Sequence, residues 1–401
     1  MPDAPKMAAE EAARLARNAV DSLPEGALAA RLQTAHVEGR SLRVKLGIDP
    51  TAPDIHLGHA VVLGKLREFQ DAGHRVVLIV GDYTARVGDP SGRSSLRPML
   101  SVAEIDANAA TFQEQALRIL DPDPARLEVR RNSEWLEMGM TALLELVGTT
   151  TVAQLLERED FSKRWSASQP ISMLELMYPL LQGYDSVAVK ADVEMGGTDQ
   201  KFNLLLGRDI QRAYGRPEQA VMTMPILVGV DGRQKMSKSL GNQIGVMDAP
   251  EEMYGKTLSI PDEAMADYYR LLLHREPPGE EVSPRDAKRA LARELVGWLH
   301  SGEQAIAAES HFDRLFVEHQ APEQVEEACM RAGDDGMVHL PEVMADTFGM
   351  SRSEARRLID QGGVALGEST LGKGEHDVSL DRANGQVLKV GKRRFRHLRA
   401  V

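Results

Sequence analysis

The chain has 401 residues, of which 42% are hydrophobic and 27% charged, and its net charge is −12. These values are typical of a globular protein with two or three domains. No stretch reaches the roughly 18 consecutive apolar residues of a membrane helix, so we expect no membrane partner. The single cysteine, Cys329, excludes an intrachain disulfide and favours a reducing compartment. Early acidic residues argue against a secretory leader.

The first 80 residues predict helices followed by a parallel sheet. Residues 1 to about 38 are rich in Ala, Leu, Arg and Glu and predict two helices, separated by Ser22-Leu23-Pro24. From Arg43 the strand-like RVKLGI, a helix-like segment that ends at Gly73, and the β-branched run RVVLIVGD follow one another. Strand, helix and strand in this order predict a βαβ unit.

A second α/β half follows a helical insertion. After the polar loop GDPSGRSSLRP, Ser101 begins a helix, with Glu104 at capping-box spacing. Residues 127–185 alternate short apolar pieces with helices, including ISMLELMYPLLQGYD. The strand VAVKAD, the helix TDQKFNLLLGRDIQRAYG and the strand AVMTMPILVG come next. Two α/β halves separated in this way predict a split nucleotide-binding fold.

The remainder predicts helices and then a small mixed module. Strand signals stop near residue 248, four or five helices run to about 332, and helices at 340–347 and 351–361 precede short strands. The predicted fold class is α/β: a Rossmann-like parallel-sheet domain with a helical insertion, then an α-helical domain and a small α+β module. The predicted boundaries are 1–38, 39–247 with the insertion at about 120–185, 248–335 and 336–401.

Two histidines stand at the start of a predicted helix. His56 and His59 are three residues apart and follow Pro53 and Asp54, which disfavour helix. A helix N-terminus favours anions, and two imidazole donors there suit phosphate oxygens. Gly58 would let a flat ring approach the backbone. The alternative is that His56 caps the helix and His59 packs on the sheet; a metal site is disfavoured because no third ligand stands at suitable spacing.

Two lysines stand in a loop after a predicted strand. The segment DGRQKMSKSLG places Lys235 and Lys238 between glycines, and two ammonium groups on a mobile loop suit a polyphosphate leaving group. Alone, the segment could be an ordinary solvated loop. Together and in this order, HLGH and KMSKS strongly resemble the signature motifs of the class I aminoacyl-tRNA synthetases. The first motif reads HIGH in that family, so the chain departs from it only at Leu57.

Three further blocks narrow the resemblance. In YPLLQGYD the polar residues Tyr178, Gln182 and Asp185 share one face of a predicted helix, and such groups need partners if they are buried. The alternative is a helix that lies across the domain surface. EMGGTDQKFN and GDPSGR add two glycines and further polar residues. These blocks resemble the bacterial-type tyrosyl-tRNA synthetases, from about residue 40 to 330 and again at the C-terminus.

The resemblance implies a role for each matching residue. Asp185 would accept a hydrogen bond from the substrate phenol. Positions that match contacts to tyrosine are Gly47, Asp89, Tyr178, Gln182, Asp185 and Gln200. Positions that match contacts to ATP are Thr51, His56, Gly58, His59, Gly197, Asp199, Ile226, Leu227, Lys235, Lys238 and Ser239. The implied catalytic set is Thr51, His56, His59, Lys235 and Lys238, and Arg93 and Arg97 are further candidates for pyrophosphate contacts.

One position departs from the family. Many members have a tyrosine two residues before the glycine that matches Gly47, as a second partner for the substrate hydroxyl. Here that position is Lys45. Whether Lys45 substitutes for the tyrosine, or Asp185 acts with another group, stays open.

The implied reaction joins tyrosine to tRNA(Tyr). The carboxylate of L-tyrosine attacks the α-phosphorus of ATP, and the tyrosyl-adenylate then passes its acyl group to the terminal ribose of the tRNA. ATP is a substrate, magnesium accompanies it, and no protein-bound metal is expected. The family also implies a cytoplasmic homodimer, formed through the insertion at about 120–180.

The C-terminal residues are basic in an acidic chain. Residues 337–401 carry a net charge of +3, and LKVGKRRFRHLRAV contains six basic residues and no acidic one. With SRSEARRLIDQGGV, this segment resembles the small RNA-binding module named after a ribosomal small-subunit protein. The alternative is a merely solvated basic tail. The candidate RNA contacts are Arg356, Arg357, Lys392, Arg393, Arg394 and Arg396.

Two other functions compete with this interpretation. A nucleotidyltransferase with a related HxGH site predicts neither the YxxxQxxD stripe nor an RNA-binding module. A synthetase-like protein that has lost catalysis and only binds RNA is disfavoured by the intact HLGH, KMSKS and GGTDQ motifs.

Overall fold

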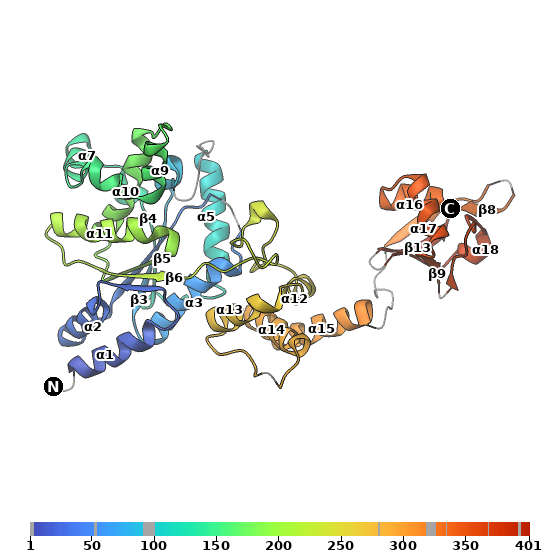
Figure 1. Cartoon of the computed structure of the whole chain (residues 1–401), viewed down its shortest axis with the longest axis horizontal. Helices are drawn as coiled ribbons and strands as arrows, with labels where there is room; N and C mark the ends of the chain where they lie inside the picture. Colours follow the sequence, from blue (N-terminus) through green and yellow to red (C-terminus); the bar gives the residue numbers. More distant parts are fainter. Residues whose placement is uncertain are drawn as a thin grey trace. The chain divides into compact units, whose positions relative to one another are not determined.

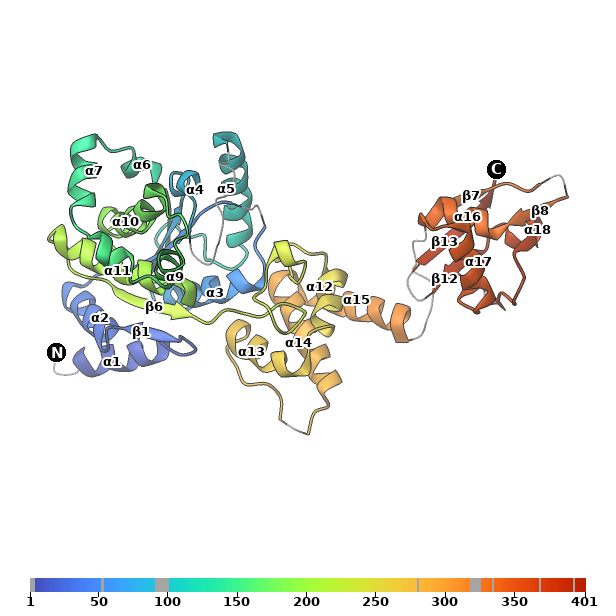
Figure 2. The ribbon, with the colours of Figure 1, turned by 45° about the horizontal axis from the view of Figure 1, so that its top comes forward.

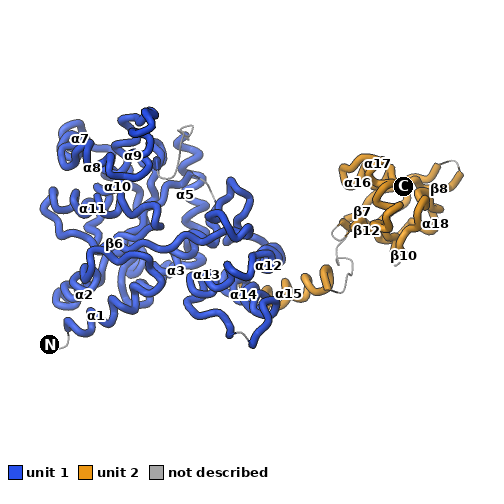
Figure 3. Tube along the Cα trace, in the orientation of Figure 1, with its two compact units in different colours: residues 1–299 blue, residues 300–401 orange. Residues whose placement is uncertain are grey.

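The structure is a computed structural model that describes residues 4–51, 54–90, 101–279, 281–317, 326–333, 335–367, 369–391 and 394–401. It divides into two compact units, residues 1–299 and 300–401 (Figure 3).

The first unit is built on a six-stranded sheet. Its order is β1-β6-β5-β2-β3-β4, and all strands are parallel except β1, which pairs antiparallel with β6. The strands are β1 (Asp21–Leu23), β2 (Arg43–Ile48), β3 (Arg75–Val80), β4 (Leu127–Arg131), β5 (Val193–Gly197) and β6 (Ala220–Met224). Strand β3 (RVVLIV) is aliphatic after its first residue because parallel sheets are covered on both faces, whereas β2 and β5 also carry the charged residues Lys45 and Glu194.

Helices cover both faces of this sheet. Figures 1 and 2 show α10 and α11 on one face and α1, α2 and α3 on the other. Their bounds are α1 (Ala4–Leu15), α2 (Ala27–Glu38), α3 (Leu57–Asp71), α10 (Met173–Ala188) and α11 (Lys201–Ala213). Helix α5 (Val102–Ala116) begins as predicted, since Ser101 Oγ accepts from the Glu104 backbone N–H at 3.3 Å.

Two sequence predictions are wrong in this region. The sequence predicts Leu127–Arg131 within the helical insertion, but these residues form β4, at the edge of the sheet. Only Leu127 of this strand is buried, so its sequence lacks the apolar pattern of an inner strand. VAVKAD was predicted as a strand. Instead Val187 and Ala188 end α10, where Val187 packs in an apolar cluster with Leu180, and the strand begins only at Val193. A short apolar run does not distinguish the two states.

The remaining helices of the first unit lie in the insertion, after β3 and β5, and in or beyond the loop that carries Lys235 and Lys238 (residues 231–241, the lysine loop). Those of the insertion are α6 (Ser133–Leu136), α7 (Met140–Val147), α8 (Val152–Leu155) and α9 (Glu159–Ser166). Helix α4 (Thr84–Val87) follows β3, the 3₁₀ helix η1 (Thr198–Gln200) follows β5, and η2 (Lys238–Leu240) lies in the lysine loop. Helices α12 (Pro250–Leu258), α13 (Asp262–Leu272) and α14 (Pro284–Leu299) complete the first unit and bury Tyr254, Tyr268 and Tyr269.

The second unit begins with helix α15 (Gly302–Phe312) and the π-helical turn η3 (Asp313–Val317). Its sheet has the order β10-β9-β12-β13-β7, beside a β11-β8 pair. The strands are β7 (Glu327–Met330), β8 (Met337–His339), β9 (Val364–Leu366), β10 (Ser369–Thr370), β11 (Asp377–Ser379), β12 (Val387–Val390) and β13 (Arg394–Ala400). The helices are α16 (Leu340–Phe348), α17 (Arg352–Asp360) and α18 (Leu380–Ala383).

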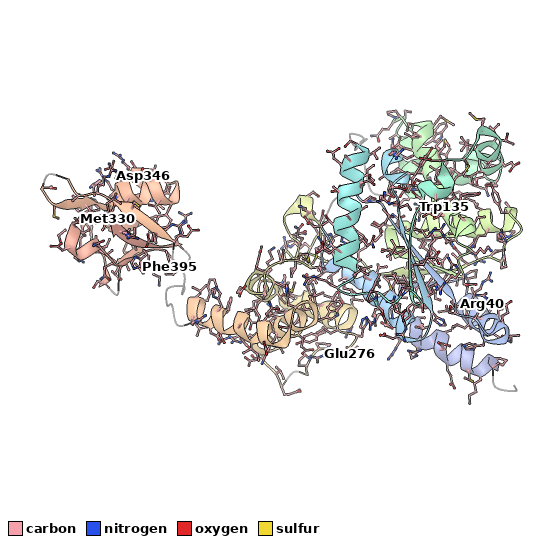
Figure 4. The ribbon with its side chains drawn as sticks, turned by 180° about the vertical axis from the view of Figure 1, so that it is seen from behind. Arg40, Trp135, Glu276, Met330, Asp346 and Phe395 are labelled. Atoms are coloured by element: carbon pink, nitrogen blue, oxygen red, sulfur yellow. The ribbon has the colours of Figure 1, made fainter. Side chains whose placement is uncertain are left out.

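A separate apolar core holds this second sheet together. Val338, Met344, Ile359 and Leu398 are all buried in it. Met330 of β7 belongs to the same core, because β7 pairs parallel with β13 (Met330 and Phe395 are labelled in Figure 4). β7 was expected to fall in the preceding helical domain. Its pairing with residues some 70 positions later leaves no local signal in the sequence.

The predicted fold class is confirmed: a parallel α/β sheet, then helices, then a small α+β module. Over the described ranges, no helix has the length and apolar character needed to cross a membrane.

Candidate active site

A cavity of about 780 Å³ opens at the carboxyl ends of the parallel strands. Its walls come from the residues that follow β2, β3, β5 and β6. Strand order reverses between β2 and β5, and these two strands pair only through Val44–Val193 and Lys45–Glu194. Ligands of doubly wound sheets bind in the crevice at such a reversal.

The structure brings the predicted site residues together. Every tyrosine or ATP candidate named from the sequence within the described ranges lines this one cavity. They are Gly47, Thr51, His56, Gly58, His59, Asp89, Tyr178, Gln182, Asp185, Gly197, Asp199, Gln200, Ile226, Leu227, Lys235, Lys238 and Ser239. Arg93 and Arg97 lie outside the described residues.

The two histidines stack at the N-terminus of α3. Their ring centroids are 3.9 Å apart, and the His56 backbone N–H donates to His59 Nδ1 at 3.3 Å. Burial lowers the pKa of His56 to about 3 and that of His59 to about 4, with the positive charge of Lys235 acting in the same direction. Both rings are therefore neutral at pH 7. His56 Nδ1 is buried without a hydrogen-bond partner among the described residues, and it lies close to Gly58.

The lysine loop lies beside the histidines, because a Cβ on Gly58 would be only 3.6 Å from Met236 Cβ. Met236 is buried, and its backbone N–H donates to the Leu227 carbonyl, so the loop is anchored between its two lysines. The side chains of Lys235 and Lys238 are 59% and 55% exposed. Lys235 Nζ lies 3.3 Å from Asp199, and Lys238 forms an ion pair with Asp54. Exposed pairs of this kind are weak and can exchange one anionic partner for another.

A second group of cavity residues is centred on Asp49, a half-buried carboxylate next to Tyr178. Asp49 follows β2 and accepts hydrogen bonds from Thr84 Oγ1 at 2.6 Å and from Tyr178 Oη at 2.8 Å. Burial raises the pKa of Asp49 to about 7, and the negative charge of Asp89 adds to that effect. This concentration of acidic groups would be relieved by a bound cation such as an α-ammonium group.

Asp185 lines the same cavity. It accepts from Trp135 Nε1 at 2.8 Å and from Asn132 Nδ2 at 3.4 Å (Trp135 is labelled in Figure 4). Burial raises its pKa to about 6, against the nearby positive charge of Lys45, which lowers it. The carboxylate is thus largely ionised at pH 7 and can accept a further hydrogen bond.

A chain of amides links the remaining polar residues. Asn203 Nδ2 donates to Gln182 Oε1 at 3.0 Å and to Gln200 Oε1 at 3.1 Å. Gln200 Nε2 then donates to Asp89 at 2.8 Å, and Arg158 lies 3.9 Å from the same carboxylate. These bonds orient Gln182 and Asp89 before any ligand arrives.

The basic residues predicted to contact RNA are on the second unit. Arg356 and Arg357 are exposed on α17, and Arg394 is exposed on β13. Arg396 is half-buried, lies 2.7 Å from Glu326 and stacks over Phe348. Lys392 and Arg393 lie outside the described residues.

Comparison with known proteins identifies the family. The family described as tRNA synthetases class I (W and Y) matches residues 37–317. Proteins named tyrosine–tRNA ligase are 49% identical in Moorella thermoacetica and 48% identical in Thermotoga maritima. The matches cover 96% of this chain in both cases, and 94% and 96% of the relatives. The chain belongs to the class I tRNA synthetases of the tryptophan and tyrosine group.

Solved structures of this synthetase family share the fold. A C-terminally truncated mitochondrial tyrosyl-tRNA synthetase from Aspergillus nidulans aligns with a TM-score of 0.63 at 21% identity, over 79% of this chain and all of that one. A tyrosyl-tRNA synthetase from Archaeoglobus fulgidus, complexed with L-tyrosine, aligns with a TM-score of 0.60 at 24% identity. That match covers 75% of this chain and 99% of the other.

Sequence reasoning missed Asp49 and Asp54, which line this synthetase cavity, and it missed Asn132 and Trp135, which hydrogen-bond to Asp185 in its wall. Asp49 had one available signal, since it directly follows a predicted parallel strand, where ligands bind. Asn132 and Trp135 had none, because they reach Asp185 from the insertion, about 50 residues away. Asp54 likewise meets Lys238 only through the fold. Among the described residues, no three His, Cys, Asp or Glu side chains are grouped as metal ligands.

Proposed function

We propose that this cavity joins L-tyrosine to ATP and that the enzyme then transfers tyrosine to the 3′ end of tRNA(Tyr). The observation that carries the proposal is the convergence of five separate sequence motifs on one cavity, with phosphate-binding groups at one end and a phenol acceptor at the other. The relatives named tyrosine–tRNA ligase, at 46–49% identity over nearly the whole chain, support the same reaction.

The buried end selects the amino acid. Asp185 accepts the hydrogen bond of the substrate phenol, while Trp135 keeps the carboxylate in position. Asp89, Tyr178 and Gln182 surround the α-ammonium group. When phenylalanine binds instead, the buried Asp185 carboxylate has no phenol to bond. The free-energy penalty of that unpaired carboxylate is larger than the loss of a single contact.

The open end binds ATP and stabilises the transition state. The substrate carboxylate attacks the α-phosphorus, and negative charge develops on the departing pyrophosphate. Lys235 and Lys238 exchange Asp199 and Asp54 for phosphate oxygens, and the neutral rings of His56 and His59 donate hydrogen bonds. These contacts accelerate the reaction to the extent that they strengthen in the transition state. Magnesium arrives with ATP and needs no cage of protein ligands.

The second unit holds the tRNA. Arg356, Arg357, Arg394 and Arg396, with Lys392 and Arg393, contact RNA phosphates, because an acidic chain needs a local cluster of cations to bind a polyanion. In functional terms, residues 39–247 form the catalytic domain and 248–317 the anticodon-side helices, and the RNA-binding module runs from β7 (Glu327–Met330) to residue 401.

The enzyme acts as a homodimer in the cytoplasm. Apolar side chains are exposed on the insertion, with Met140 69% and Leu144 63% exposed on α7 and Met173 72% exposed at the start of α10. Exposed apolar groups gathered on neighbouring helices mark an interface, and a second copy of the chain is the occupant we propose. The single cysteine agrees with a reducing compartment.

Amino-acid-dependent ATP–pyrophosphate exchange tests the proposal. Exchange should depend on tyrosine and not on the other nineteen amino acids, and tRNA should then accept tyrosine. A nucleotidyltransferase would show no amino-acid dependence. A protein that only binds RNA would bind tRNA without exchange, and either result would refute the assignment.

A further inference from the structure

Lys45 is a buried cation beneath the tyrosine end of the cavity. Its side chain is fully buried, and the cavity wall begins one residue later, at Leu46 and Gly47. Lys45 Nζ donates to the Gln182 carbonyl at 2.9 Å, to Ser186 Oγ at 2.8 Å and to Glu194 Oε1 at 2.8 Å. These three acceptors use all three protons of the ammonium group. Lys45 therefore has no proton left for a bound phenol.

Its partner Glu194 is equally buried. Glu194 stands opposite Lys45 in the pairing of β2 with β5, and its side chain is 1% exposed. It also accepts from Ser186 Oγ at 3.0 Å and from Gln219 Nε2. The two residues close the paired part of these strands, so the ion pair stands at the root of the crevice. Because a buried ion pair contributes little net stability, its position calls for another explanation.

We propose that the Lys45–Glu194 pair is a positioning device for phenol recognition: it anchors the Gln182–Ser186 turn of α10 and supplies the positive potential that keeps Asp185 an acceptor. The inference rests on the proposed function, because it assumes that Asp185 binds the phenol. Asp185 lies inside the anchored turn, between Gln182 and Ser186, so a shift of that turn moves its carboxylate. Lys45 is thus a positioning residue that acts through α10 and does not touch the substrate.

The charges around Asp185 give the pair opposite electrostatic effects. Lys45 on β2 lowers the pKa of Asp185 and Glu194 on β5 raises it, while Trp135 and Asn132 lower it through hydrogen bonds. The negative charge of Asp185 in turn raises the pKa of Asp49 and of Tyr178. A protonated Asp185 is a poorer acceptor for the phenol, so discrimination against phenylalanine should fall as the pH drops through this pKa. Neutralising Lys45 moves that loss to higher pH, and neutralising Glu194 moves it to lower pH.

The test measures the ratio of kcat/KM for tyrosine to kcat/KM for phenylalanine in pyrophosphate exchange, between pH 5 and 8.5. The ratio isolates the phenol, because both substrates share the ammonium group and ATP. The variants are Lys45→Met, Glu194→Gln and the double variant. The pH midpoint of this ratio should rise in the order Glu194→Gln, wild type, double variant and Lys45→Met. The midpoints of the two single variants should differ by on the order of one pH unit.

A matched control is available on α3. Lys65 is also fully buried and lies 2.8 Å from Glu68, and it does not line the cavity. Lys65→Met should leave the midpoint of the ratio unchanged.

The inference is overturned if both single variants move the midpoint in the same direction, or if neither moves it. A purely structural role gives no reason for loss of the positive charge and loss of the negative charge to shift the midpoint in opposite directions. An equal shift in Lys65→Met would overturn it too. If Lys45→Met does not fold, the midpoints of the other two variants decide. The midpoint of Glu194→Gln should lie below that of wild type and the midpoint of the double variant above it. Failure of the proposed function is distinct, because wild-type protein would then show no tyrosine-dependent exchange.

Discussion

Lys235→Ala should separate catalysis from folding. The Lys235 side chain is 59% exposed, and its ion pair with Asp199 spans 3.3 Å. Exposed pairs contribute about 0–1 kcal/mol, so the melting temperature should fall by about 3 °C at most. If Lys235 instead binds the departing pyrophosphate, its loss removes a donor from the transition state. Such losses cost about 3–4 kcal/mol, or on the order of 10²- to 10³-fold in rate.

The assay is tyrosine-dependent ATP–pyrophosphate exchange beside a thermal melt of the same samples. Lys163→Ala is the matched control, because Lys163 is 73% exposed and forms an ion pair with Glu159 on α9. It should retain wild-type exchange. His56→Ala should lose exchange to a similar extent as Lys235→Ala. The phosphate-site assignment is wrong if both variants keep exchange within about threefold of wild type, or if the loss of activity only follows a loss of folded protein.

The remaining predictions address the other parts of the molecule. Asp185→Ala should lose tyrosine activation and reduce the ratio of kcat/KM for tyrosine to that for phenylalanine. Sites that bind a substrate hydroxyl discriminate by about 10⁴- to 10⁵-fold, a range to which tyrosyl-tRNA synthetases themselves contribute. Unchanged discrimination in exchange assays would contradict the prediction. The folded pKa of Asp49, about 7, exceeds the unfolded value of 3.8, so wild-type stability falls as pH rises between these values. The fall in melting temperature from pH 5 to pH 8 should therefore be smaller in Asp49→Asn, and an equal fall would refute the assignment. Replacing Arg357 and Arg394 with Gln together should weaken tRNA charging and its salt dependence while exchange persists; charging equal to wild type across salt concentrations would argue against the module. Leu144→Arg should yield monomers in analytical ultracentrifugation, and an unchanged dimer would place the interface elsewhere.

The sequence alone determined the elements and the chemistry that depend on local pattern. RVVLIV and the largely aliphatic RVKLGI are strands because apolar runs suit a sheet covered on both faces. Ser101 and Glu104 begin a helix because their spacing satisfies two free backbone N–H groups. HLGH and KMSKS predicted phosphate-binding groups because each motif keeps its functional side chains within one or two turns of chain. The pattern of YPLLQGYD predicted one polar helix face, and its phenol-binding role came from the resemblance to the tyrosyl-tRNA synthetases.

Only the tertiary structure decided how distant residues combine. The pattern could not place β4 or β7, because an edge strand with few buried residues and a strand paired across some 70 residues carry weak local signals. It left Lys45 as a candidate partner for the phenol, whereas the fold turns its ammonium group toward Gln182, Ser186 and Glu194. The reason is physical: hydrogen bonds and burial depend on which strands and helices become neighbours. Lys45 and Glu194 are 149 residues apart in the chain and meet only because β2 and β5 pair.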